Sequence, residues 1–119
     1  LRVPVADHIF QYASKLVRST RPGQDDAPDF IKDWVSWGCG PRASLNLIVG
    51  AKARAVLRGR FNVAVEDIQA LALPVMRHRM GLNFAAQSEG VDTDHVVGKL
   101  LQTIPADGSL YHGASTAAV

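Results

Sequence analysis

The side chain best suited to chemistry is that of Arg42, which follows Gly40 and Pro41 at the start of a long apolar segment. Gly40 suits the N-cap of a helix and Pro41 its first position, so Arg42 falls in the first turn. The free N–H groups at a helix start favour a bound anion, and a guanidinium adds two donors for phosphate oxygens. The helix dipole disfavours a cation at this end of a helix, so the presence of an arginine there needs an explanation. From the spacing alone, the simpler interpretation is a surface arginine paired with a nearby acid, and an anion site is the alternative.

Metal and nucleophile chemistry have little support in the sequence. The histidines are scattered, with no pair at metal-ligand spacing, so no metal site is expected. The single cysteine, Cys39, excludes an intrachain disulfide and a multi-cysteine zinc site, and nothing near it supports a role as a nucleophile. Trp34 and Trp37 are interpreted as core or interdomain packing, with ligand stacking as the alternative.

The remaining arginines have simple interpretations. The run Arg77-His78-Arg79 predicts a solvated cationic turn, and the alternative is a contact with a neighbouring subunit or partner. A second group lies near the end of the long apolar segment, where cations favour the C-terminal end of a helix dipole. Its members are Arg54, Arg58 and Arg60.

Four segments with helical periodicity must position these residues. They are residues 4–20, 41–57, 63–79 and 93–103. Pro74 is expected to end or kink the third helix, and Asp92 to cap the fourth. The apolar residues of 41–57 surround that helix almost completely, which predicts a central helix covered by neighbours. Gly50 within it indicates a close approach of another helix, because glycine otherwise costs about 1 kcal/mol there.

The sequence therefore predicts an all-α fold, a small bundle of four main helices, over residues 1–105. Residues 106–119 are expected to form a flexible tail, since they offer little to bury. With 119 residues, 47% hydrophobic and 20% charged, the chain fits one globular domain. No segment approaches the length of a membrane span and no signal peptide is visible, which with one cysteine favours a cytoplasmic location. The start at Leu1 suggests an excised domain or a processed chain.

Several short motifs follow one another in an informative order. Residues 38–43, Gly-Cys-Gly-Pro-Arg-Ala, resemble the Gly-Ala-Ser-Pro-Arg-Ala run that opens a lid helix in MoxR-family AAA+ ATPases. Residues 16–21 resemble that family's LVRATR, residues 57–60 its LRGR and residues 65–68 its TPDDV. Residues 76–80 resemble LRHRI, and residues 88–91 resemble AEGV. The chain is thus similar to the C-terminal lid of these ATPases, with Cys39-Gly40 standing where Ala-Ser is usual.

The resemblance implies a function for Arg42 and partners for the chain. Arg42 matches the sensor 2 arginine, which reaches the γ-phosphate of ATP, and Gly40 and Pro41 present it to the nucleotide. ATP and Mg²⁺ are then cofactors of a full-length protein, with an N-terminal ATPase module, a hexameric ring and a von Willebrand A-domain protein as partners. Because the sequence has no phosphate-binding Gly-Lys-Ser/Thr loop, the chain alone is expected to bind no cofactor and to be inactive.

A different class of function remains open. A stand-alone helical module for protein or nucleic-acid interaction would also fit a small helical bundle. The net charge of only +2 and the lack of a continuous basic stripe make nucleic acid an unfavoured partner.

Overall fold

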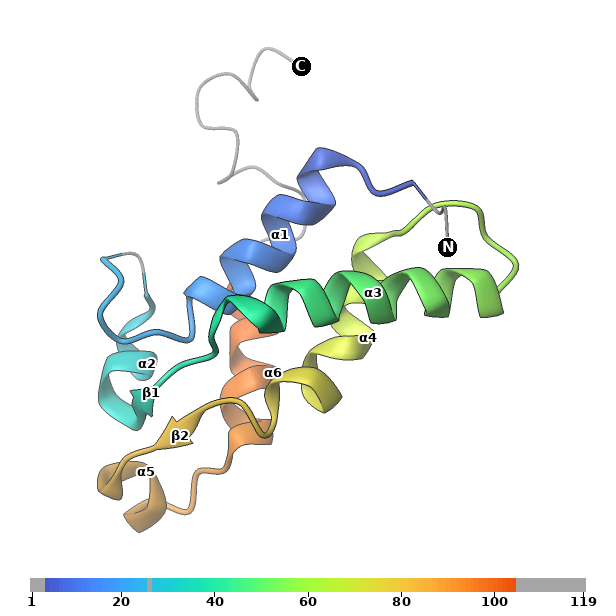
Figure 1. Cartoon of the computed structure of the whole chain (residues 1–119). Coiled ribbons are helices and arrows are strands. Elements are labelled where there is room, and N and C mark those ends of the chain that lie inside the picture. Colours follow the sequence, from blue (N-terminus) through green and yellow to red (C-terminus); the bar gives the residue numbers. More distant parts are fainter. Residues whose placement is uncertain (1–3, 26, 105–119) are drawn as a thin grey trace.

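The computed structural model describes residues 4–25 and 27–104, and these form a predominantly helical fold (Figure 1). Four main helices account for most of it: α1 (Asp7–Arg18), α3 (Pro41–Leu57), α4 (Val65–Met76) and α6 (Thr93–Thr103). Two short helices, α2 (Asp29–Trp34) and α5 (Phe84–Ser88), and two short strands, β1 (Val35–Trp37) and β2 (Gly81–Leu82), complete it. The all-α fold with four main helices is therefore confirmed, while the expected tail at 106–119 lies outside the described residues.

The helices surround one apolar core. The inner side of α1 buries Ile9, Leu16 and Val17, and α6 buries Val96 and Leu100. The N-cap expected for α6 is confirmed, because the Asp92 carboxylate accepts a hydrogen bond of 2.8 Å from the His95 N–H. Burial of these aliphatic side chains at helical spacing is what orders the bundle.

Helices α3 and α4 pack against each other and approach closely at Gly50. A Cβ atom at Gly50 of α3 would lie 2.8 Å from Leu71 Cδ1 of α4, so the absence of a side chain allows the approach. The close helix–helix contact predicted at Gly50 is confirmed. The turn between the helices includes Gly59 with φ +72°, a conformation that side-chain-bearing residues seldom adopt.

Pro74 lies inside α4, which ends two residues later at Met76. The prediction that the third helix would continue to residue 79 is wrong by about one turn. Proline has no N–H, so the carbonyl four residues before Pro74 loses its hydrogen-bond donor within the helix. Pro74 is exposed, which leaves this part of the helix near solvent.

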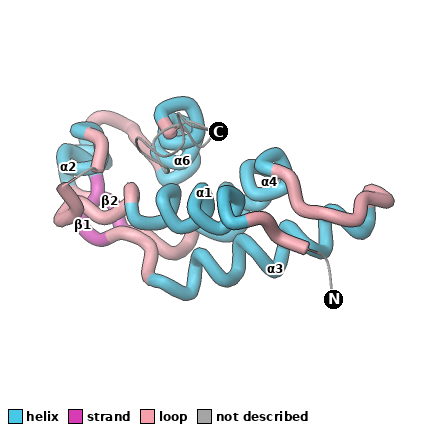
Figure 2. The backbone as a smooth tube through the Cα atoms, turned by 90° about the horizontal axis from the view of Figure 1, so that it is seen from above, coloured by secondary structure: helices cyan, strands magenta, loops and turns pink. Residues whose placement is uncertain are grey.

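A small lobe lies at one end of α3, where α2 and β1 are beside β2 and α5 (Figure 1). Figure 2 shows α2, β1 and β2 together at this end of the molecule. The strands are antiparallel, with Val35 opposite Leu82 and Trp37 opposite Gly81. Asn83 joins the parts of the lobe: its Nδ2 donates to the Asp33 carbonyl at 2.7 Å, and its Oδ1 accepts from the Ala86 N–H at 3.0 Å. Asn83 is thus the N-cap of α5 as well as its link to α2.

Among the described residues, no helix combines the length and the apolar character that a membrane crossing requires.

Candidate functional site

Arg42 lies in the first turn of α3, as its position after Gly40 and Pro41 predicts. Gly40 is the N-cap, with extended backbone and a carbonyl that accepts from the Ala43 N–H at 3.1 Å, and Pro41 is the first helical residue. Gly40, Pro41 and Arg42 are all exposed. The structural part of the prediction is confirmed, while phosphate binding by the turn is not tested by it.

No acidic partner of Arg42 is found among residues 4–25 and 27–104, where it takes part in no ion pair or hydrogen bond. The simpler interpretation, a surface arginine paired with a nearby acid, is therefore not what this part of the chain shows. The guanidinium faces solvent and is available to a ligand outside the bundle.

The face of α3 that carries Arg42 is apolar and uncovered. Leu45, Val49 and Val56 recur at helical spacing from Arg42 and are 56%, 57% and 46% exposed. The prediction that neighbours cover this helix on all sides is wrong, because only its other side packs on α1 and α4. An exposed apolar stripe on a small domain is typical of a surface that another protein or domain covers.

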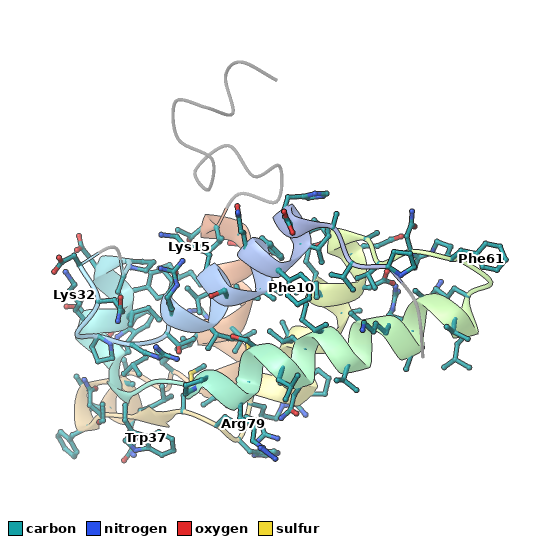
Figure 3. All side chains as sticks on the ribbon, turned by 45° about the horizontal axis from the view of Figure 1, so that its top comes forward. Phe10, Lys15, Lys32, Trp37, Phe61 and Arg79 are labelled. Carbon is teal, nitrogen blue, oxygen red and sulfur yellow. The ribbon has the colours of Figure 1, made fainter. Side chains whose placement is uncertain are left out.

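A groove between α1 and α3 extends this surface. Its cavity volume is about 310 Å³, and Phe10 of α1 lies between the two helices at its edge (Figure 3). The walls are almost wholly apolar, and seven residues contribute to them: Phe10, Gln11, Ala13, Ser14, Ser44, Leu45 and Ile48. The groove reaches Ser44 and Leu45, so it lies directly beside the first turn of α3.

The loop before α3 is fixed by the end of α1. Thr20 Oγ1 accepts from the Cys39 N–H at 2.8 Å and donates to the Val17 carbonyl at 2.6 Å. The next residue, Arg21, donates from Nε to the Cys39 carbonyl at 2.8 Å. Cys39 is fully buried, and burial raises the pKa of its thiol, so it suits packing rather than nucleophilic chemistry.

A buried carboxylate joins the other ends of α3 and α4. Asp67 is 0% exposed and accepts from Arg54 Nη1 at 2.6 Å, from Arg60 Nη1 and Nη2 at 2.8 and 2.5 Å, and from the Ala64 N–H at 2.8 Å. Burial acts to raise the pKa of Asp67, but the hydrogen bonds from Arg60, Ala64 and Arg54 outweigh it and lower the pKa to about 2. Arg54 and Arg60 therefore have a structural role. The interpretation from the sequence, which explained them by the helix dipole, missed their common partner Asp67.

The lowered pKa of Asp67 predicts a pH dependence of stability. A carboxylate whose pKa is lower in the folded chain stabilises the fold above its unfolded pKa, and this contribution disappears as pH falls through the folded value. Because the pKa of Asp67 falls from its ordinary value of 3.8 to about 2, the contribution to the free energy of unfolding is about 2 kcal/mol and is lost between about pH 5 and pH 2. Urea unfolding of the wild type and Asp67→Asn across this range should show a smaller pH-dependent loss in the variant. Equal losses would contradict the assignment.

The other candidates lie apart from Arg42. Arg77 donates from Nε to the Asp94 carboxylate at 2.7 Å, which links α4 to α6 at the surface, while His78 and Arg79 are exposed. The Arg77-His78-Arg79 run is therefore only partly a solvated face. In the described residues, no group of three or more His, Cys, Asp or Glu side chains could hold a metal ion.

The two tryptophans have different environments. Trp34 is half-buried, with the Lys99 ammonium 5.2 Å from its ring and the His95 ring edge-on at 5.7 Å. Trp37 is 58% exposed on β1 (Figure 3). Packing is therefore confirmed for Trp34, whereas Trp37 contributes mainly to the surface of the small lobe.

Known proteins similar to this chain agree with the fold. Residues 31–100 match the AAA lid domain family. The chain is 32% identical over 96 residues to the chaperone MoxR1 of Mycobacterium tuberculosis, covering 81% of this chain and 26% of that protein. It is also 32% identical over 98 residues to the uncharacterized protein YeaC of Bacillus subtilis, covering 82% of this chain and 28% of YeaC.

A solved structure gives the same result. The crystal structure of a candidate ATPase from Cytophaga hutchinsonii superposes with a TM-score of 0.82 at 29% identity, covering 87% of this chain and 32% of that one. The chain thus spans between a quarter and a third of the length of each of these proteins. The order of helices, the match over more than half the sequence and these similarities lead to one conclusion: the chain belongs to the AAA lid domain family, in the form found in MoxR-like AAA+ ATPases.

Proposed function

We propose that this domain is the lid of a MoxR-type ATPase and supplies Arg42 as the sensor 2 residue to a bound nucleotide. The observation that carries the proposal is the exposed first turn of α3, where Arg42 has no ion-pair or hydrogen-bond partner among the described residues. A planar guanidinium can donate two parallel hydrogen bonds to the γ-phosphate oxygens of ATP. In ADP these oxygens are missing, so the lid acquires a higher affinity for the ATP state.

That difference in affinity is what allows the nucleotide to move the lid. A ligand shifts a conformational equilibrium only by its differential interaction with the two states. Contact between Arg42 and the γ-phosphate favours a closed lid. Hydrolysis and release of the phosphate remove this contact. The same guanidinium stabilises negative charge that develops during phosphoryl transfer.

The surface around Arg42 supports a second part of the proposal, which is docking on an ATPase module that precedes the lid in the same protein. Leu45, Val49 and Val56 form an uncovered apolar stripe on the face of Arg42, and the α1–α3 groove extends it. Burying this surface against the module would bring Arg42 towards the nucleotide. In this proposal the module holds ATP and Mg²⁺, as the AAA+ family implies, while the 119 residues contain no phosphate-binding loop.

The family and the similarity to MoxR1, a protein named as a chaperone, support a proposal for the wider setting. The full-length ATPase assembles into a cytoplasmic hexameric ring, in which the lid transmits nucleotide state to the neighbouring subunit. It acts on partner complexes in a chaperone-like way together with a von Willebrand A-domain protein.

Nucleotide preference tests the proposal. Wild-type ATPase and the Arg42→Ala variant would be titrated in Mg²⁺ with ADP and with a slowly hydrolysed ATP analogue. The variant should lose about tenfold of the preference for the ATP analogue, as expected for the loss of charge-assisted hydrogen bonds. Arg58→Ala is the matched control, because Arg58 is an exposed arginine at the opposite end of α3. An unchanged preference in Arg42→Ala would sink the sensor assignment.

A further inference from the structure

The segment that leads into α3 is anchored at a single residue, Cys39, to the residues that directly follow α1. Thr20 and Arg21 hold the N–H and the carbonyl of Cys39 respectively, each at 2.8 Å. Thr20 is fully buried and its own hydroxyl proton is engaged by the Val17 carbonyl at 2.6 Å. The Cys39 backbone is therefore fixed from both sides by consecutive residues at the end of α1.

The neighbouring Gly38 shows how closely the loop before α3 approaches the segment that follows α1. A Cβ atom at Gly38 would collide with the Thr20 carbonyl and lie 2.7 Å from Thr20 Oγ1. The contact leaves no room for a side chain, so the approach of the loop to α1 is set by backbone and by hydrogen bonds. Arg42 lies three residues after the anchored Cys39, with only Gly40 and Pro41 between them.

From this geometry we propose that Thr20 and Arg21 are positioning residues for Arg42, which act through the backbone of Cys39. The inference rests on the proposed sensor role of Arg42. Arg42 has no ion-pair or hydrogen-bond partner of its own among the described residues, so its reach is set by where α3 begins. The hydrogen bonds to Cys39 fix that start relative to α1, and therefore relative to the bundle that closes over the nucleotide.

A positioning role predicts a particular kinetic effect. A displacement of about 1 Å at a catalytic group can cost up to about 100-fold in rate. In the full-length ATPase, Thr20→Val should lower kcat about tenfold with a smaller change in KM. Valine keeps the shape of threonine but removes the hydroxyl that holds both Cys39 and Val17. Thr20→Ser restores the hydroxyl and should recover most of kcat.

The decisive measurement is a double-mutant cycle with Arg42→Ala. If Thr20 acts through Arg42, Thr20→Val should lower kcat about tenfold in the wild type and cause little further loss in Arg42→Ala. Thr103→Val is the matched control, because Thr103 Oγ1 also donates to a helix carbonyl, that of Lys99 at 2.8 Å, but is exposed at the end of α6. It should leave kcat unchanged.

Each outcome bears on the inference. An unchanged kcat in Thr20→Val, or the same fold loss in both backgrounds, would overturn the positioning role. If Thr20→Val does not fold, Arg21→Met replaces it in the cycle, because methionine keeps the apolar stem of the partly buried Arg21 and removes its donor. If Arg42→Ala itself has normal turnover and nucleotide preference, the proposed sensor function fails, which is a result separate from failure of the cycle.

Discussion

Replacing Asp67 by asparagine is expected to lower the free energy of unfolding by about 3 kcal/mol, which is a large part of the stability of a domain of this size. Asparagine has nearly the same shape but no charge, and its amide group would present donors to the donors of Arg54 and Arg60. Arg54 would then lie in a partly buried site without its carboxylate partner, and Arg60 would keep only the exposed Glu66, whose Oε1 lies 3.8 Å from Arg60 Nη2. The loss stays at the lower end for a broken buried ion pair, because the side chains of Arg54 and Arg60 remain 23% and 29% exposed.

The matched control makes the same chemical change at the surface. Asp94→Asn removes the partner of Arg77 from an ion pair whose side chains are 41% and 47% exposed, so it should cost less than about 1 kcal/mol. Urea unfolding of the wild type and both variants at neutral pH gives the comparison. If Asp67→Asn is no more destabilising than Asp94→Asn, the buried carboxylate does not hold α3 to α4.

The four main helices could be predicted from the sequence because their signals are local. Pro41 after Gly40 and Asp92 before an apolar-periodic run mark the starts of α3 and α6, which begin at Pro41 and Thr93. The end of α4 was less predictable. A proline near the last turn removes a hydrogen bond that the helix is about to lose in any case, so α4 includes Pro74 and stops at Met76.

The small lobe could not be predicted, because its structure depends on contacts between distant segments. The pairing of Val35 with Leu82 joins residues that no periodic pattern connects. Asn83 offered a signal for a helix start, but α5 covers only Phe84–Ser88, too short for a recognisable apolar stripe. The exposure of the apolar stripe on α3 could not be predicted for another reason. The sequence shows that a helix face is apolar, but it does not show whether another element covers that face.

The same limit applies to the site. Arg42 could be located from the sequence because helix-start residues and a family motif coincide there. The anchoring of Cys39 by Thr20 and Arg21 could not, because hydrogen bonds from side chains to the backbone of a loop leave no periodic signal. Asp67 was visible only as an acid in the first turn of a helix. Its two arginine partners lie 13 and 7 residues away in the sequence, and folding alone brings them together.

Replacing Arg42 by alanine is expected to lower kcat of the full-length ATPase about 100-fold or more. The estimate follows from removing one preorganised donor to charge that develops in a transition state, which costs about 100- to 1000-fold in other enzymes. Arg42→Lys should recover only part of this rate, because an ammonium is a point charge without the planar pair of donors. The lid itself should fold normally, since Arg42 is exposed and makes no ion pair or hydrogen bond within the described residues.

The delivery of Arg42 to the nucleotide is tested by the steady-state rate of ATP hydrolysis at saturating ATP, measured for the wild type, Arg42→Ala and Arg58→Ala. We expect a loss of about 100-fold in Arg42→Ala and a rate within about twofold of the wild type in Arg58→Ala. Equal rates for all three proteins, or equal losses in the two variants, would contradict the claim that the first turn of α3 delivers a catalytic arginine to the nucleotide.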